Sequence, residues 1–183
     1  MTLDEFQSKF LEFTEKQVEP LKDDGYPVCP YAKSARIKRA LQFIDGRDDL
    51  TVMDTFDPET YQMGIVWLGD IDDITPVEKI CEEYRKKNPH LLYFTSTRQS
   101  GHFVKNFTDC VFIQRANDLL EKRKHLHDNT NYYDSWPEDY YKLIMGHWVW
   151  VGPFLILLIS STRLFIRSIN SLILSTGIVI ISW

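Results

Sequence analysis

Cys29 is the residue whose type and setting point most directly to chemistry. It stands before Pro30, and Lys33 and Arg36 follow within two helical turns. Proline favours the first position of a helix, so Cys29 is predicted to be the N-cap residue. The positive end of the helix dipole and the two basic side chains would stabilise a thiolate there. The pattern predicts a nucleophile or an anion contact, although a small apolar cysteine packed at a helix start fits it too.

Arg98 and His102 form a second polar group, in a loop that follows the apolar run Leu91–Ser96. A guanidinium binds carboxylates and phosphates well, and an imidazole can serve as a general base. If this loop meets Cys29 at one sheet edge, Cys29 and His102 would be catalytic. Lys33, Arg36 and Arg98 would then bind a small anionic ligand. An ordinary hairpin loop explains the same residues without a ligand.

Three acidic residues, Asp70, Asp72 and Asp73, follow an apolar run that ends at Leu68. Open α/β sheets often bind ligands at the edge where such strands end. Carboxylates with water could hold Mg²⁺ at that edge. The alternative is a solvated loop whose charges complement the dipole of the next helix.

The stretch Cys29-Pro30-Tyr31 resembles the redox motif of glutaredoxins, with Ala32 where a dithiol member has its second cysteine. The resemblance is confined to these few residues and implies a monothiol redox protein. In that case Cys81 or Cys110 would be the distant resolving partner.

Residues 29–33 also resemble the Cys-Pro-Phe-Ala-Lys signature of an uncharacterised bacterial domain family. The similarity extends from about Val28 to Leu126 and includes the stretch 91–103. It implies a fold of helices and strands in a similar order, and it implies no activity.

Hydrophobic spacing and capping signals predict the elements that must position these residues. The helices have amphipathic spacing with Ser, Thr or Pro near their starts, and the strands are rich in Val, Ile, Thr and aromatics. The predicted helices are 2–18, 30–44, 75–87, 116–127 and 135–145. The predicted strands are 50–56, 61–68, 91–96 and 109–114, the first two as an antiparallel pair.

This order of elements predicts an α+β fold, a two-layer sandwich with a mixed sheet of three to four strands and packed helices. The unit 61–97 reads as strand, helix, strand, and such crossovers make their strands parallel. The globular domain is predicted to span residues 1–145, followed by a hydrophobic tail, residues 146–183.

The charges of the chain are concentrated in the predicted domain. All 26 acidic residues and all but two of the 21 basic ones precede Ile144, so the domain is acidic. Nucleic-acid binding usually needs a basic surface, and none is expected here. Three widely spaced cysteines fit a reducing compartment, and the acidic start MTLDEF is unlike a secretory signal, so a cytoplasmic domain is predicted.

The tail carries only Arg163 and Arg167 as formal charges. Residues 149–166 approach the length of about 20 apolar residues that a membrane span needs, with Arg163 near the interface and Trp148 and Trp150 in the aromatic belt. The first interpretation is therefore a membrane anchor, residues 148–183. A degenerate or read-through extension and a soluble helical extension remain open.

Together these patterns predict a small-ligand or anion-binding domain, with thiol dependence as one option, held at a membrane by its tail, with no cofactor. A non-enzymatic interaction module without an active site and a monothiol redox protein are the alternatives.

Overall fold

The computed structural model describes residues 1–98, 107–138 and 141–142. The chain divides into two compact units, Met1–Ser135 and Trp136–Trp183, and the boundary at residue 145 stays a prediction. In the second unit Glu138, Tyr141 and Lys142 are helical, as predicted for that stretch. The hydrophobic tail lies outside the described residues. Among those that are described, no helix has the length and apolar character to cross a membrane.

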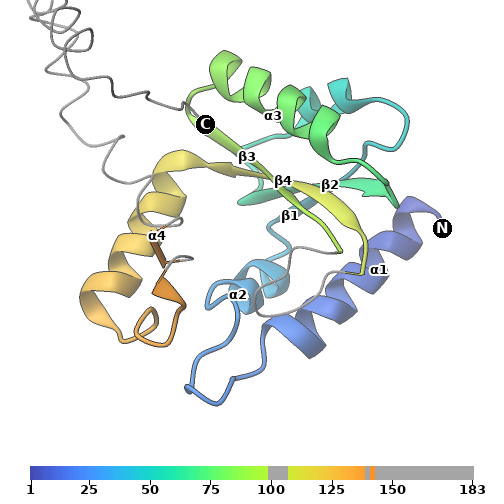
Figure 1. Ribbon diagram of the computed structural model, residues 1–183. Helices are drawn as coiled ribbons and strands as arrows, with labels where there is room; N and C mark the ends of the chain where they lie inside the picture. Colours follow the sequence, from blue (N-terminus) through green and yellow to red (C-terminus); the bar gives the residue numbers. More distant parts are fainter. Residues whose placement is uncertain (99–106, 139–140, 143–183) are drawn as a thin grey trace, which may run out of the picture. The chain divides into compact units, whose positions relative to one another are not determined.

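The first unit is built on the four-stranded mixed sheet of Figure 1, which confirms the predicted α+β class. Its strands, in the spatial order β1-β2-β4-β3, are β1 (Leu41–Asp45), β2 (Met63–Gly69), β4 (Asp109–Arg115) and β3 (Leu91–Ser96). β1 runs parallel to β2, and β4 is antiparallel to both of its neighbours. β2 and β3 are therefore parallel, as their helical crossover predicts, but β4 lies between them.

Three predicted helices are confirmed with small changes at their ends. They are α1 (Leu3–Phe13), which continues as a π-helical turn η1 (Thr14–Val18), α3 (Thr75–Lys87) and α4 (Ala116–Asn129). The capping box at the start of α1 is formed, because Thr2 accepts from the Glu5 amide and the Glu5 carboxylate accepts from the Thr2 amide. These helices form where local capping and amphipathic spacing agree.

The predicted helix 30–44 is wrong in its second half. Helix α2 covers only Ala32–Ile37, and the chain then enters β1. Arg39 has a φ of 53°, and the amides of Arg39 and Ala40 donate to the carbonyls of Arg36 and Ala35. This is a Schellman motif with an arginine in the left-handed position that glycine usually takes. This end of the helix was not predicted, because an arginine, unlike a glycine, is not a recognised signal for a left-handed residue.

The predicted strand 50–56, and with it the antiparallel pair, is also wrong. Leu50–Thr55 is a 3₁₀ helix, η2, and Asp49 caps it by accepting from the Thr51 amide. The partner of β2 on this side is β1, in parallel register from Leu41 opposite Met63 to Asp45 opposite Trp67. A capping aspartate therefore outweighed the β propensity of the residues that follow it.

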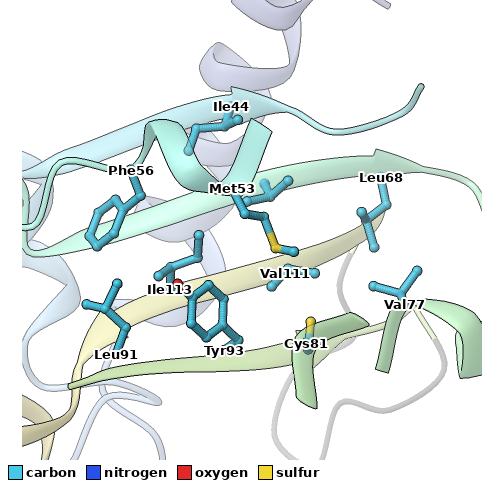
Figure 2. Packing of buried hydrophobic residues seen from close by; sticks show 11 residues of the cluster. Ile44, Met53, Phe56, Leu68, Val77, Cys81, Leu91, Tyr93, Val111 and Ile113 are labelled. Atoms are coloured by element: carbon cyan, nitrogen blue, oxygen red, sulfur yellow. The ribbon is translucent and has the colours of Figure 1, made fainter. Parts of the chain in front are cut away.

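Helices cover both faces of the sheet, so the unit has three layers rather than the predicted two. On one face Met53 of η2 and Cys81 of α3 pack against the buried sheet side chains Ile44, Val111 and Ile113, as Figure 2 shows. On the other face α1 covers Ile65, Trp67 and Cys110 through Phe6, which is fully buried. We call these the α3 face and the α1 face.

Candidate functional site

Cys29 does not lie at the position that the sequence predicted. Helix α2 begins at Ala32 with Tyr31 as its N-cap residue, and it is only six residues long. The Cys29 carbonyl accepts from the Ala32 amide at 3.2 Å, so Cys29 belongs to the turn before the helix. Burial raises the pKa of the Cys29 thiol, and the opposing effects of the Tyr31 and Ala32 amides and of Lys122 are smaller. These effects do not favour the low-pKa thiolate that the sequence predicted.

The segment around Cys29 is held by contacts that look structural. The Tyr132 hydroxyl donates to the Val28 carbonyl at 2.5 Å, and the Tyr31 hydroxyl donates to the Lys122 carbonyl of α4 at 3.3 Å. The Lys122 ammonium also lies 5.2 Å from the centre of the Tyr31 ring. These bonds dock the segment on α4 and on the residues after it, which explains why the thiol is desolvated.

The thiols proposed as resolving partners are separated by the sheet. Cys81 lies in the core of the α3 face and Cys110 in that of the α1 face, and both are buried. Burial raises the pKa of Cys81 to about 11 and that of Cys110 to about 12. Neutral, buried thiols exchange slowly, so the redox interpretation gains no support from them.

Two of the three basic residues of the predicted anion site, Arg36 and Arg98, already face carboxylates. The Arg36 guanidinium donates to Glu19 at 2.6 Å and to Glu15 at 3.2 Å, and Lys33 is exposed on α2. Arg98 lies 3.2 Å from Asp70 and 3.5 Å from the buried Asp109. An incoming anion would have to compete with these acids, which argues against the site.

Asp109 explains the position of Arg98. Its carboxylate accepts from the Arg98 amide at 2.8 Å and from the Ile71 amide at 3.1 Å, which joins the ends of β2 and β3 to the start of β4. His102 lies outside the described residues. Among the residues that are described, no hydrogen bond or ion pair joins Cys29 to Arg98, and the pairing of Cys29 with His102 stays a prediction.

Among the three acids after β2, Asp70 and Asp73 contact different partners. Asp70 pairs with Arg98, and Asp73 accepts from the Thr75 amide at 2.9 Å, at the start of α3. Hydrogen bonds from Thr75 hold the pKa of Asp73 below its usual value. Asp72 is exposed. Within the described ranges no three carboxylate, imidazole or thiol groups converge as metal ligands would, and the predicted magnesium site is not assembled.

A cleft that sequence reasoning missed lies elsewhere, between the segment Gly46–Thr51 and α3. Its volume is about 560 Å³, within the range of about 300–1,000 Å³ that small-ligand pockets occupy. Its apolar lining is buried or half-buried and consists of Leu50, Leu68, Ile71, Val77 and Ile80. Its polar lining consists of Arg47, Asp48, Asp49, Thr51, Glu83 and Tyr84.

The topology of the sheet creates this cleft. Gly46 follows the last residue of β1 and Leu68 is near the last residue of β2, so the cleft lies at the carboxyl ends of the parallel pair. This is where open α/β sheets bind ligands. Gly46 also allows a close approach, because a Cβ there would lie 2.5 Å from the Val66 side chain. The sequence signal was the apolar run before Asp45-Gly46, but it was assigned to a helix.

Comparisons of the chain with protein-family models, with curated proteins and with solved structures gave no match. Both family resemblances stay predictions, and the argument for function rests on the cleft.

Proposed function

We propose that residues 1–135 form a small-ligand-binding domain whose ligand occupies the cleft at the carboxyl ends of β1 and β2. The observation that carries the proposal is a pocket of ligand size with an apolar lining and several polar groups around it. The cleft is lined by residues from three separate segments, which meet only in the folded chain. The proposal concerns binding, and it assigns no reaction.

The test is a screen of small neutral, anionic and cationic fragments by protein-observed NMR. We expect resonances of Gly46–Thr51 and of Val77–Tyr84 to shift together, while those of α4 stay in place. Thr51→Trp should abolish binding, because Thr51 is exposed and lines the cleft. Thr55→Trp is the matched control, on an exposed residue of the same 3₁₀ helix outside the cleft. Fragments that bind equally to both variants, or no binding at all, would favour the interaction module without a site.

We also propose that residues 148–183 tether this domain to a membrane. The support is the composition of the tail, which contains no acidic residue and no lysine. Chain translated in the presence of lipid vesicles should float with them and resist alkaline carbonate. Ile156→Lys with Leu157→Lys should prevent this, since charges in a span are costly. A parent chain that stays in the soluble fraction would contradict the tether and leave the cleft proposal untouched.

A further inference from the structure

The charges that line the cleft are unequal in sign. Three carboxylates line it, those of Asp48, Asp49 and Glu83, against one guanidinium, that of Arg47. Asp49 accepts two hydrogen bonds from Thr51, from the amide at 2.8 Å and from the hydroxyl at 2.5 Å. These bonds hold the pKa of Asp49 below its usual value, so this carboxylate is ionised at neutral pH. The rim of the cleft is therefore acidic.

Arg47 offsets these acids only in part, because its guanidinium is paired with Asp45. Its guanidinium donates to both oxygens of Asp45, at 2.9 and 2.6 Å, and lies 4.0 Å from the centre of the Trp67 ring. Trp67 belongs to the α1 face, on the other side of the sheet. The positive charge is thus neutralised by Asp45 and drawn toward the face that does not hold the cleft.

The lysines of α3 do not neutralise the excess of acidic side chains that line the cleft. Lys87, one turn after Glu83, lies 3.0 and 3.1 Å from the two carboxylate oxygens of Asp54, and the Tyr84 hydroxyl donates to the same carboxylate at 3.3 Å. Lys79, one turn before Glu83, is exposed and is not among the lining residues. A ligand in the cleft therefore meets more negative than positive charge above an apolar floor.

We infer that the cleft selects small organic cations, with an ammonium or guanidinium group at the Asp48, Asp49 and Glu83 rim and an apolar stem over Leu68 and Ile80. This inference rests on the proposed function and adds the class of ligand to it. An apolar stem gains from burial on the floor, and a positive head gains from the acidic rim. The sequence had favoured an anionic ligand, on basic residues that the fold places away from this cleft.

The experiment compares three probes of one shape on the full chain at pH 7: hexylammonium, 1-hexanol and hexanoate. NMR titration of the Gly46–Thr51 and α3 amides gives the affinity for each. We expect hexylammonium to bind about three- to tenfold more tightly than hexanol, and hexanoate most weakly. Because partly exposed charges are screened, this preference should shrink when the ionic strength rises from 0.01 to about 0.5 M.

Two variants test whether the carboxylates at the rim cause the preference for hexylammonium. Glu83→Gln and Asp48→Asn should each reduce hexylammonium binding by about 1.5- to fivefold and leave hexanol binding unchanged. Glu82→Gln is the matched control, since Glu82 lies on the same helix, pairs with Lys86 and does not line the cleft. Equal or tighter binding of hexanol or hexanoate overturns the cation inference and leaves the proposed function standing. If none of the three probes binds, the cation inference fails, and the fragment screen alone decides the proposed function.

Discussion

The two faces of the sheet are packed differently. On the α1 face the rings of Phe6 and Trp67 stack 5.0 Å apart and 8° from parallel, and Phe10 meets Phe43 edge to face. On the α3 face the same sheet is covered by η2 and α3, and a cleft of about 560 Å³ remains beside them. One face is therefore filled by aromatic side chains, and the other leaves space for a ligand.

The difference follows from how each cover is made. Helix α1 supplies most of the cover of the α1 face, joined by Phe107, and its phenylalanines recur at helical spacing, so Phe6 and Phe10 point to the same side. The α3 face is covered by two elements far apart in the sequence, and the segment between β1 and η2 must turn before either can close the gap. The cleft lies where two covering elements meet. The amphipathic pattern of one helix alone cannot predict such a cleft.

The largest effect should come from truncating a side chain on the closed face. Phe6→Ala is expected to lower the free energy of unfolding by about 3–5 kcal/mol, since Phe6 is fully buried. Ile80→Ala, at the half-buried lining of the cleft, should cost about 1–2 kcal/mol because part of that side chain is already in water. Urea denaturation measures both. Equal losses would mean that the two faces are packed alike.

The buried thiols test whether the cores of both faces exclude water. Their raised pKa values mean that the unfolded chain ionises first, from the ordinary value of 9.0, so stability is lost as the pH rises above 9 towards 11 or 12. Between pH 8 and 10 each thiol should remove about 1.4 kcal/mol. Cys81→Ala and Cys110→Ala should each weaken that pH dependence by this amount. An unchanged dependence in one variant would show that the face concerned admits water.

The smallest effect concerns the turn that leads into β1. This strand contributes Phe43 to the α1 face and Ile44 to the α3 face. Arg39→Gly should stabilise the fold by about 1 kcal/mol, because a side chain in the left-handed region is strained and glycine is not. Lys38→Gly is the matched control. Its φ is −75°, where glycine only adds freedom to the unfolded chain, so it should destabilise. Thermal melting separates them, and a loss with Arg39→Gly would refute the strain.

The elements predicted correctly have signals within their own sequence. The capping box at Thr2, the proline near the start of α3 and the apolar runs of β3 and β4 all act over a few residues. The two wrongly predicted elements, Leu41–Asp45 and Leu50–Thr55, were missed for a similar reason. An arginine in a left-handed turn and an aspartate cap set the conformation there, and neither is distinguishable by residue type from its exposed, charged neighbours.

The sequence by itself determined the α+β class, most of the helices and the acidic character of the domain, because these depend on local propensity, periodicity and counting. Only the tertiary structure decided that Cys29 lies in a turn before α2, that Arg36 and Arg98 meet carboxylates, and that β1 and β2 end beside α3. Burial and ion pairing depend on which distant segments come together. A site composed of such segments therefore exists only once the chain has folded.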